Sequence, residues 1–323
     1  MRSYWLVPTG GTITLEPRDV PRPEPQPGQL LVAVRASCFN RGEVILSHGA
    51  ERAPPKPAGG ECAGEIESIG PGVEGFAPGE RVMGRCVGGF AEHAIMDARE
   101  AMRIPPLLTW EQAAAIPLVF MVAYDMLVTH GRLAAGEWLL ITGVSSGVGI
   151  ATLQMAKVLG ANVIGTSGSE AKLDKLKRLG LDVGVVTRGT GFYEPAMQAT
   201  DRKGVNLVVN NVGGTVFAEC VRALAFEGRL ATVGYLDRTF KAEIDLEALH
   251  TKRLRLFGVS NKLRPAASRA ETVRAFARDF LPYFASGRIE PVIDRAFTFD
   301  EVAAARAYFE SNALFGKVVV RMP

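Results

Sequence analysis

The stretch Ile141-Thr-Gly-Val-Ser-Ser-Gly-Val-Gly149 decides the fold of this chain. It follows an apolar run, Glu137 to Thr142, that predicts a buried strand, and it opens a segment with helical periodicity, Gly149 to Leu159. A glycine-rich turn in this context is typical of a dinucleotide site, because the helix N-terminus offers unpaired amides to a pyrophosphate. We therefore expect cofactor contacts from the turn residues Gly143, Ser145, Ser146, Gly147, Val148 and Gly149.

Strand and helix patterns alternate beyond this turn. Asn162 to Thr166 predicts a strand and Ser169 to Leu179 a helix, and further strands are expected at Val205–Val209, Arg229–Val233 and Leu254–Val259. This alternation implies an α/β fold with a doubly wound parallel sheet of the Rossmann type. Ligands bind such sheets at the carboxyl ends of the strands, which makes candidates of Asn210, Asn211, Gly234, Tyr235, Ser260 and Asn261.

The end of the second strand of this sheet favours NADP over NAD. An NAD site usually places an acid there to accept from the ribose 2′-hydroxyl, whereas Thr166-Ser-Gly-Ser169 contains none. Lys172 follows this segment, and Arg188 follows the third strand of the sheet. Each cation alone is typical of a solvated surface, but together with the acid-free strand end they predict donors to a 2′-phosphate.

The first third of the chain has a different texture, with short strands between Gly- and Pro-containing turns. Strands are predicted at Leu30–Ala36, Ala63–Ile69 and Arg81–Met83, and the C-terminal segment adds a helix, Ala270–Ser286, and a strand, Gly316–Val320. The predicted organisation is a substrate domain in two parts, residues 1–117 and 261–323, with the Rossmann domain over residues 118–260 inserted between them.

The composition excludes several classes of protein. Within 323 residues the formal net charge is only +3, and no basic run suggests a nucleic-acid partner. No signal-peptide core and no stretch of ~20 apolar residues is present, so no membrane association is expected. Four cysteines without CxxC spacing predict reduced thiols and a cytoplasmic location.

A series of ordered motifs resembles the medium-chain dehydrogenase/reductase superfamily. The motifs include Gly60-Glu-Cys-Ala-Gly-Glu-Ile-Glu-Ser-Ile-Gly70, Gly89-Phe-Ala-Glu92, Val212-Gly-Gly214 and the terminal Gly316-Lys317. Gln154-Met-Ala-Lys157 and the glycine turn are similar to the quinone oxidoreductase branch. The resemblance implies a GroES-like, β-barrel-type substrate domain, and it adds Gly316 and Lys317 to the expected cofactor contacts.

The resemblance also bears on the catalytic metal of the zinc-dependent members. Their first Cys position falls on Asn40, their His position on Gly60, and their other Cys position near Leu118. A catalytic zinc needs three protein ligands, and Glu61 alone remains. We therefore expect no metal: metal analysis should find no stoichiometric zinc, and activity should survive exhaustive chelation.

Without a Lewis acid, hydride transfer requires an acceptor whose own π-system spreads the negative charge. The expected activity is an NADPH-dependent, zinc-independent reduction of a conjugated carbonyl compound, above all a quinone or an enone. Phe39-Asn-Arg-Gly-Glu43 resembles the N-x-x-D element that lines quinone reductase active sites. It makes catalytic candidates of Asn40, Arg41 and Glu43, although Arg41 and Glu43 also fit a surface pair. His48 and Tyr124 stay open: His48 as a proton donor or a loop residue, Tyr124 as a cofactor contact or a core tyrosine.

Two alternatives to a quinone or enone reductase remain. One is an enoyl-thioester reductase, similar to the enoyl reductase domains of polyketide synthases. The other is a non-catalytic NADPH-binding protein with a structural or RNA-binding role. The final strand of the Rossmann sheet, Leu254–Val259, is apolar enough to predict a homodimer that pairs this edge with its copy, unless the chain itself covers the edge.

Overall fold

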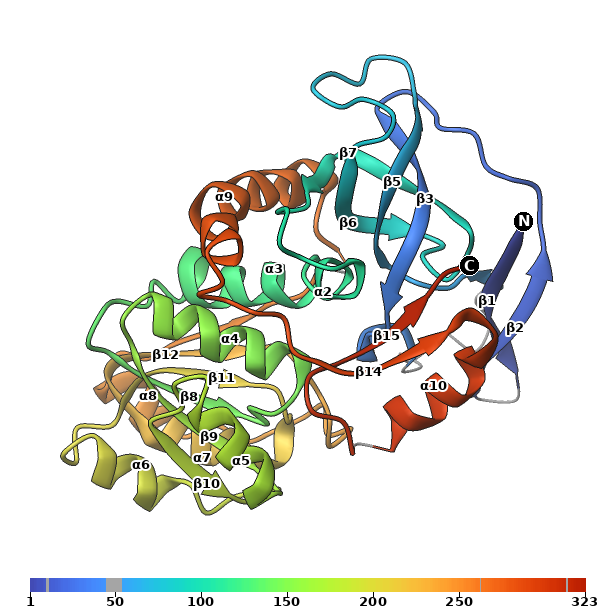
Figure 1. The fold of residues 1–323 in the computed structure, drawn as a ribbon. Helices are drawn as coiled ribbons and strands as arrows, with labels where there is room; N and C mark the ends of the chain where they lie inside the picture. The colour runs from blue at the N-terminus through green and yellow to red at the C-terminus, as the bar shows by residue number, and fades with distance from the viewer. Residues whose placement is uncertain (10–11, 45–53, 262, 312) are drawn as a thin grey trace. The chain divides into compact units, whose positions relative to one another are not determined.

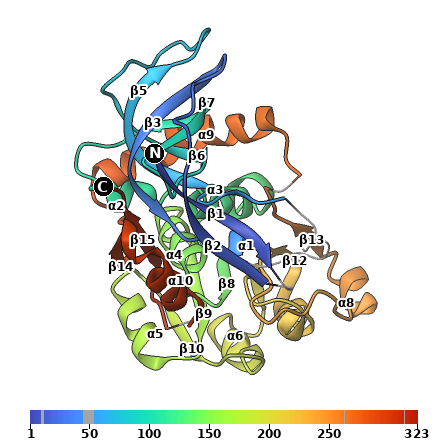
Figure 2. The ribbon, with the colours of Figure 1, turned by 90° about the vertical axis from the view of Figure 1, so that its right-hand side faces the viewer.

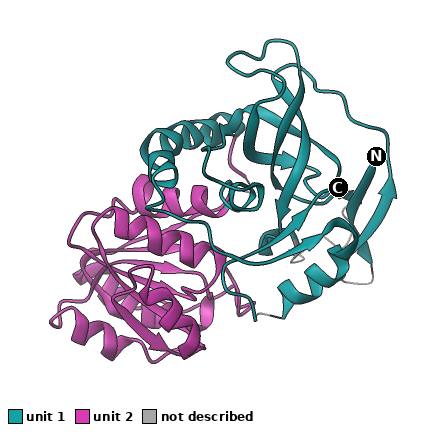
Figure 3. Cartoon of the chain, viewed as in Figure 1, with its two compact units in different colours: residues 1–118, 266–323 teal, residues 119–265 magenta. Residues whose placement is uncertain are grey.

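The computed structural model describes residues 1–9, 12–44, 54–261, 263–311 and 313–323. The chain forms two compact units: residues 1–118 with 266–323, and residues 119–265 (Figure 3). The boundaries predicted from the sequence lie after residues 117 and 260. Among the described helices, none is both long and apolar enough to span a membrane.

The unit of residues 119–265 is built on a six-stranded parallel sheet with helices on both sides (Figure 1). The strand order is β10-β9-β8-β11-β12-β13. Successive strands are therefore added outward from β8 in one half of the sheet and outward from β11 in the other half. The strands are β8 (Trp138–Thr142), β9 (Asn162–Ser167), β10 (Val183–Val186), β11 (Val205–Asn210), β12 (Leu224–Thr232) and β13 (Arg255–Gly258). The helices are α3 (Val119–Tyr124), α4 (Gly147–Val158), α5 (Glu170–Lys177), α6 (Tyr193–Ala199), α7 (Phe217–Ala223) and α8 (Leu246–Thr251). This is the predicted Rossmann-type sheet.

Burial explains why these strands are apolar along their whole length. Leu139, Leu140 and Ile141 of β8 have no exposed surface, because helices cover both faces of a central parallel strand. Helix α4 also buries most of its residues, which fits its position between the sheet and α3. Strand β13 lies at one edge of the sheet, and its ends are exposed.

The other unit contains a six-stranded sheet in the order β14-β15-β3-β5-β6-β7, which an additional β3–β7 pairing closes on itself. Its strands are β3 (Gln29–Cys38), β5 (Glu61–Ile69), β6 (Arg81–Val87), β7 (His93–Arg103), β14 (Ile293–Thr298) and β15 (Lys317–Arg321). The helices of this unit are α1 (Arg41–Val44), α2 (Trp110–Ala114), α9 (Ala266–Ala285) and α10 (Val302–Glu310). Closure by the β3–β7 pairing gives the expected GroES-like, barrel-type domain.

The C-terminal segment completes this unit, because β15 pairs with β3 in antiparallel register, Val319 opposite Cys38. Arg269 on α9 makes a bidentate ion pair with Glu100 on β7, at 2.6–2.9 Å. Glu100 is 4% exposed, so this pair fixes α9 on the sheet in a setting with little water. Residues far apart in the sequence thus form one core.

Several strands were not predicted from the sequence. Strands β1 (Arg2–Thr9) and β2 (Thr12–Asp19) form a hairpin (Figure 2). Strand β4 (Lys56–Pro57) pairs with β1. Pro8 and Pro17 and the absence of regular alternation conceal this hairpin.

Strand β12 begins at Leu224, five residues before the predicted Arg229, because a bulge in its pairing with β11 accommodates Glu227 at φ +56°.

The four cysteines, Cys38, Cys62, Cys86 and Cys220, are free thiols and all buried. Burial raises the pKa values of the Cys38 and Cys220 thiols far above the usual range. They are therefore structural residues of the two cores rather than reactive groups.

Candidate functional site

The glycine turn has the geometry of a phosphate-binding loop. Gly143 adopts φ +64°, and a Cβ on Gly149 would lie 2.6 Å from the carbonyl oxygen of Val144. Ser146 caps helix α4: its hydroxyl accepts from the Gly149 amide at 3.1 Å and donates to the Gly143 carbonyl at 2.8 Å. The 12-residue helix α4 therefore begins at this turn, with its N-terminal amides beside the glycines.

The end of β9 is attached to this turn. Thr166 Oγ1 accepts from the Gly143 amide at 3.1 Å, and the hydroxyls of Ser145 and Ser167 lie 3.3 Å apart. Ser169 is the N-cap of α5, and its hydroxyl accepts from the Lys172 amide at 3.4 Å. Four of the predicted cofactor residues thus hold the loops at the ends of β8 and β9 in a fixed arrangement.

Arg188 crosses the end of β9. A Cβ on Gly168 would lie 2.6 Å from Arg188 Nε and 3.0 Å from its Cδ, so the Arg188 side chain passes directly over this glycine. Any larger residue at position 168 would displace it. The structure therefore brings Arg188 to the acid-free strand end, where the sequence predicts the donors to a 2′-phosphate.

The predicted asparagines at the end of β11 point into the unit. Asn210 has no exposed surface; its amide donates to the Gly213 carbonyl, and its oxygen accepts from Thr142. Asn211 Nδ2 donates to the Thr142 carbonyl at 2.9 Å. Both side chains therefore hydrogen-bond the end of β11 to the end of β8 and do not extend outward.

The other residues predicted around this sheet edge differ in exposure. Tyr124 is buried at the end of α3, whereas Tyr235 is 44% exposed and packs on Phe240 at 5.1 Å between ring centroids. Gly234 lies so close to the backbone of Asn211 that a Cβ there would be 2.7 Å from its carbonyl oxygen. Ser260 is exposed and Asn261 half-buried.

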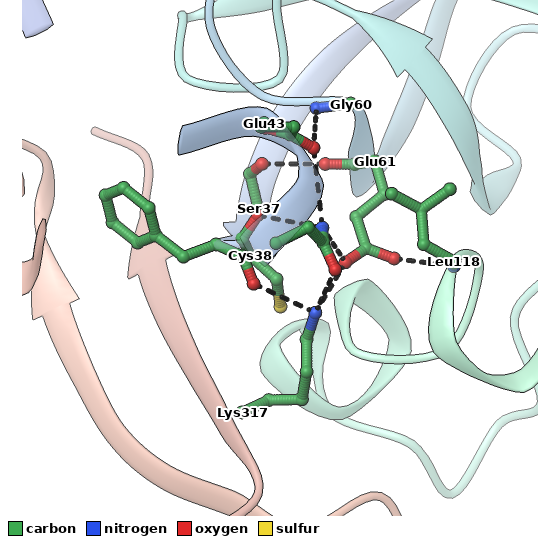
Figure 4. Close-up of polar contacts among 9 residues, drawn as sticks. Ser37, Cys38, Glu43, Gly60, Glu61, Leu118 and Lys317 are labelled. Carbon is green, nitrogen blue, oxygen red and sulfur yellow. Dashed lines mark hydrogen bonds and ion pairs between the residues drawn. The ribbon is translucent and has the colours of Figure 1, made fainter. Parts of the chain in front are cut away.

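A second group of predicted residues meets inside the other unit (Figure 4). The Lys317 ammonium lies 2.8 Å from Glu61 Oε1, 2.7 Å from Asn40 Oδ1 and 3.1 Å from the Phe39 carbonyl. Asn40 Nδ2 donates to the same Glu61 oxygen at 2.7 Å, and the Leu118 amide donates to the other at 2.8 Å. Glu61 has no exposed surface and Lys317 is 5% exposed. This is a buried, hydrogen-bonded ion pair, which we call the Lys317 cluster.

Glu43 adjoins the Lys317 cluster. Its Oε1 accepts from the Gly60 amide at 3.1 Å and lies 3.5 Å from Asn40 Nδ2. Burial and then the neighbouring Glu61 carboxylate raise the pKa of Glu43 to about 7, against the opposing effect of Lys317. Arg41 on the same short helix stacks over Phe309, 5.1 Å from the ring centroid. His48 lies outside the described residues.

Two family models match the chain. Residues 26–106 match the alcohol dehydrogenase GroES-like domain, and residues 147–277 match the zinc-binding dehydrogenase. The first match lies in the unit of residues 1–118 and 266–323, and the second covers most of the unit of residues 119–265 and extends into α9. The chain belongs to the medium-chain dehydrogenase/reductase superfamily.

Solved structures of this superfamily resemble the chain along its whole length. An NAD-dependent alcohol dehydrogenase is 27% identical with a TM-score of 0.88, and covers 100% of both chains. A mycobacterial protein complexed with NADPH is 26% identical with a TM-score of 0.90, over 99% of this chain and 100% of that one. A mycobacterial quinone oxidoreductase is 25% identical with a TM-score of 0.87, over 99% of each. The chain therefore has the fold of an oxidoreductase that binds a nicotinamide cofactor.

Curated relatives include polyketide synthases. The spectinabilin polyketide synthase system protein NorB of Streptomyces orinoci is 34% identical over 92% of this chain. A phenolphthiocerol/phthiocerol polyketide synthase of Mycobacterium tuberculosis is 32% identical over 96%. The highly reducing polyketide synthase lcsB of Purpureocillium lilacinum is 31% identical over 92%. The chain spans only 12–14% of the length of these three relatives.

The zinc of some superfamily members does not fit the donor set of this chain. The Lys317 ammonium occupies the position between Asn40 and Glu61 that a cation would take, and it uses their oxygens as its own acceptors. Position 60, where the zinc-dependent members have a His, is a glycine whose amide donates to Glu43 Oε1 at 3.1 Å, so the chain offers no imidazole there. Over the described ranges, no group of three or more His, Cys, Asp or Glu is arranged to hold a metal ion.

Two residues of these sites, Glu61 and Asp237, were not among the site residues predicted from the sequence. Glu61 was noted only as an insufficient zinc ligand, yet a lone carboxylate in the small-residue run Gly59-Gly-Glu-Cys-Ala63 requires a buried partner. Asp237 joins the loops after β11 and β12: it accepts from the Thr215 amide and hydroxyl at 2.8 and 2.6 Å and from the Thr239 amide at 2.8 Å. An Asp two residues before a Thr is a signal for such a turn.

Proposed function

We propose that this chain is an NADPH-dependent reductase of enoyl thioesters that works without zinc. The observation that carries the proposal is the similarity of more than nine-tenths of the chain to polyketide synthases, one of them named as highly reducing. A reducing synthase needs a nicotinamide-dependent reduction of thioester-bound chains, and the fold of this chain supplies a nicotinamide site. The enoyl thioester, which was the alternative from the sequence, thus takes precedence over the quinone or enone.

The Lys317 cluster supports a conjugated acceptor. A bound NADPH supplies a hydride, and the acceptor must take up the negative charge that arrives with it. In a reaction without zinc, with the oxygens of Asn40 and Glu61 already engaged by Lys317, the thioester carbonyl itself would delocalise that charge as an enolate. An α,β-unsaturated thioester provides this delocalisation, whereas a simple ketone does not.

The experiment is a screen of NADPH consumption with crotonyl-CoA, 1,4-benzoquinone, 2-cyclohexenone and a 2-alkenal. We expect kcat/KM for the enoyl thioester to exceed that for the quinone by at least about tenfold, which corresponds to ~1.4 kcal/mol of transition-state stabilisation. A preference for the quinone would establish the second candidate, which the structural similarity to a quinone oxidoreductase favours. NADPH binding without oxidation by any acceptor would point to a non-catalytic protein.

NADPH rather than NADH is the cofactor in this proposal, because Arg188 crosses the acid-free end of β9. Arg188→Ala should weaken NADPH binding about tenfold or more, since one charge-assisted hydrogen bond to the 2′-phosphate contributes ~1.5 kcal/mol. Lys172→Ala should act in the same direction. The binding of both cofactors is measured by fluorescence titration. NADH binding is the control and should not change. An equal loss for both cofactors would remove these residues from the phosphate site.

A homodimer through Leu254–Val259 is part of the proposal, supported by the edge position of β13. Leu256 and Phe257 are half-buried within one chain. Pairing with a second β13 would give the edge amides hydrogen-bond partners and would cover these two side chains. Leu256→Lys and Leu256→Pro should both yield monomers in light scattering at micromolar concentration, with the far-ultraviolet circular dichroism spectrum unchanged for Leu256→Lys. A native protein that already runs as a monomer at this concentration has no such interface.

A further inference from the structure

The Lys317 cluster and Glu43 bring two carboxyl groups and one ammonium together in the interior. Glu61 opens β5, Lys317 opens β15, and Glu43 and Asn40 follow β3, so three strands of one sheet converge there (Figure 4). The charged and titratable groups that face Glu43 are Glu61 from β5, Lys317 from β15, Cys38 from β3 and Cys86 from β6. Burial raises the pKa of Cys38, and the hydrogen bond with Cys62 together with burial raises that of Cys86, so both thiols stay protonated and only the two carboxyls and the ammonium determine the charge.

The charge of this group is not balanced when both carboxyls are ionised. One ammonium can compensate one carboxylate, and Lys317 contacts Glu61 directly at 2.8 Å. Glu61 receives two further donors, from Asn40 and Leu118, whereas Glu43 receives the Gly60 amide and only a long contact from Asn40. A second, uncompensated negative charge in a buried setting is costly, and it is removed when the less stabilised carboxyl takes up a proton. That carboxyl is Glu43.

Glu43 also has access to the surroundings that Glu61 lacks. As a residue Glu43 is half-buried, near the end of a short helix, while Glu61 has no exposed surface. The pKa of about 7 that burial and Glu61 give to Glu43 places its proton exchange near neutrality, where a general acid is most effective. The arrangement therefore contains one carboxyl that holds a proton and can pass it on, and one that serves as a fixed counter-charge.

We propose that Glu43 is the acid that protonates the reduced substrate. In this proposal Glu61 is a positioning residue that keeps Glu43 protonated before the reaction, and Lys317 and Asn40 are positioning residues that hold the Glu61 carboxylate in place. This inference rests on the proposed reduction of enoyl thioesters. A hydride from NADPH brings two electrons to the β-carbon, and the π-electrons of the double bond move toward the thioester carbonyl. The α-carbon then takes the Glu43 proton, the carbon–oxygen π-bond is restored, and the Glu43 carboxylate regains a proton from water.

The test begins with Glu43→Gln, which keeps the shape of the side chain and removes its acidic proton. With crotonyl-CoA and NADPH we expect kcat to fall by about 100- to 10,000-fold, the range that a general acid contributes. Glu43→Asp, which keeps an acid at the same position, should recover part of this loss. The matched control is Glu65→Gln, on the same strand as Glu61 but in an exposed ion pair with Arg35, and it should retain wild-type kcat.

The pH profile separates an acid from a merely structural residue. The wild-type rate should fall as the pH rises through about 7, because the carboxyl loses its proton. Glu61→Gln removes the neighbouring negative charge and leaves Lys317 to Glu43, so the pKa of Glu43 and the falling limb should both move to lower pH. Infrared difference spectra, with the Glu43 C=O band assigned by its loss in Glu43→Gln, should follow the same midpoints without turnover.

The outcomes distinguish this inference from the proposed function. Wild-type turnover of crotonyl-CoA with an unchanged kcat in Glu43→Gln, or a falling limb that Glu61→Gln does not move, would overturn the role of Glu43 and leave the reductase intact. Absence of wild-type turnover with every enoyl thioester would overturn the proposed function, and the proton transfer with it.

Discussion

Lys317→Met is expected to lower the free energy of unfolding by about 3–5 kcal/mol, because it leaves the Glu61 carboxylate buried without its counter-charge. Glu61 has no exposed surface, so water cannot replace the lost ammonium. The change should be measured by urea unfolding at pH 7.5, with the midpoint and the slope fitted separately. Methionine has a similar length and adds no charge, so the loss reports on the ion pair rather than on a cavity.

Two further variants delimit this result. Lys317→Met combined with Glu61→Gln removes both charges and should recover a large part of the lost stability, because a neutral pair leaves no uncompensated ion. Lys157→Met breaks a partly exposed ion pair with Asp182 and should cost at most about 1 kcal/mol. Equal effects of Lys317→Met and Lys157→Met would show that Lys317 is not the counter-charge of a buried carboxylate.

Gly149→Ala is expected to raise the dissociation constant for NADPH by at least about 100-fold, or ~2.7 kcal/mol. The added Cβ would lie 2.6 Å from the Val144 carbonyl oxygen and 2.7 Å from that of Gly143, and both are backbone atoms that can move only with the whole turn. The turn would then lose the arrangement in which its amides converge on a pyrophosphate. Isothermal titration calorimetry with NADPH measures the effect.

Gly258→Ala is the matched control for this prediction. A Cβ there would meet nothing nearer than the Thr232 carbonyl at 4.0 Å, and the residue lies in the same unit. NADPH affinity should remain at the wild-type value in this variant. An unchanged affinity in Gly149→Ala as well would mean that the turn does not bind the cofactor.

The Rossmann-type fold and its glycine turn were predictable because their signals are local. Strands that are buried on both faces have apolar sequences, so they can be recognised from short segments. The strand–turn–helix order of residues 137–159 locates the turn without information from the rest of the chain. The fold class predicted from these signals and the superfamily that the ordered motifs resemble are confirmed. The hairpin of β1 and β2 escaped prediction because Pro8, Pro17 and the lack of regular alternation leave it without a strand pattern of its own, although its two strands pair along their whole length.

What only the tertiary structure decided is where the charged and polar side chains meet. Asn40 and Lys317 are 277 positions apart, and the pairing of β15 with β3 brings them to 2.7 Å. Nothing in the local sequence indicates that Lys317 faces Glu61 or that Asn210 points inward, because burial and partners depend on the whole fold. By itself the sequence determined the fold and the location of the nucleotide turn. The tertiary structure decided which carboxyl is a counter-charge and which one holds a proton, because proton affinity depends on burial and on neighbouring charges.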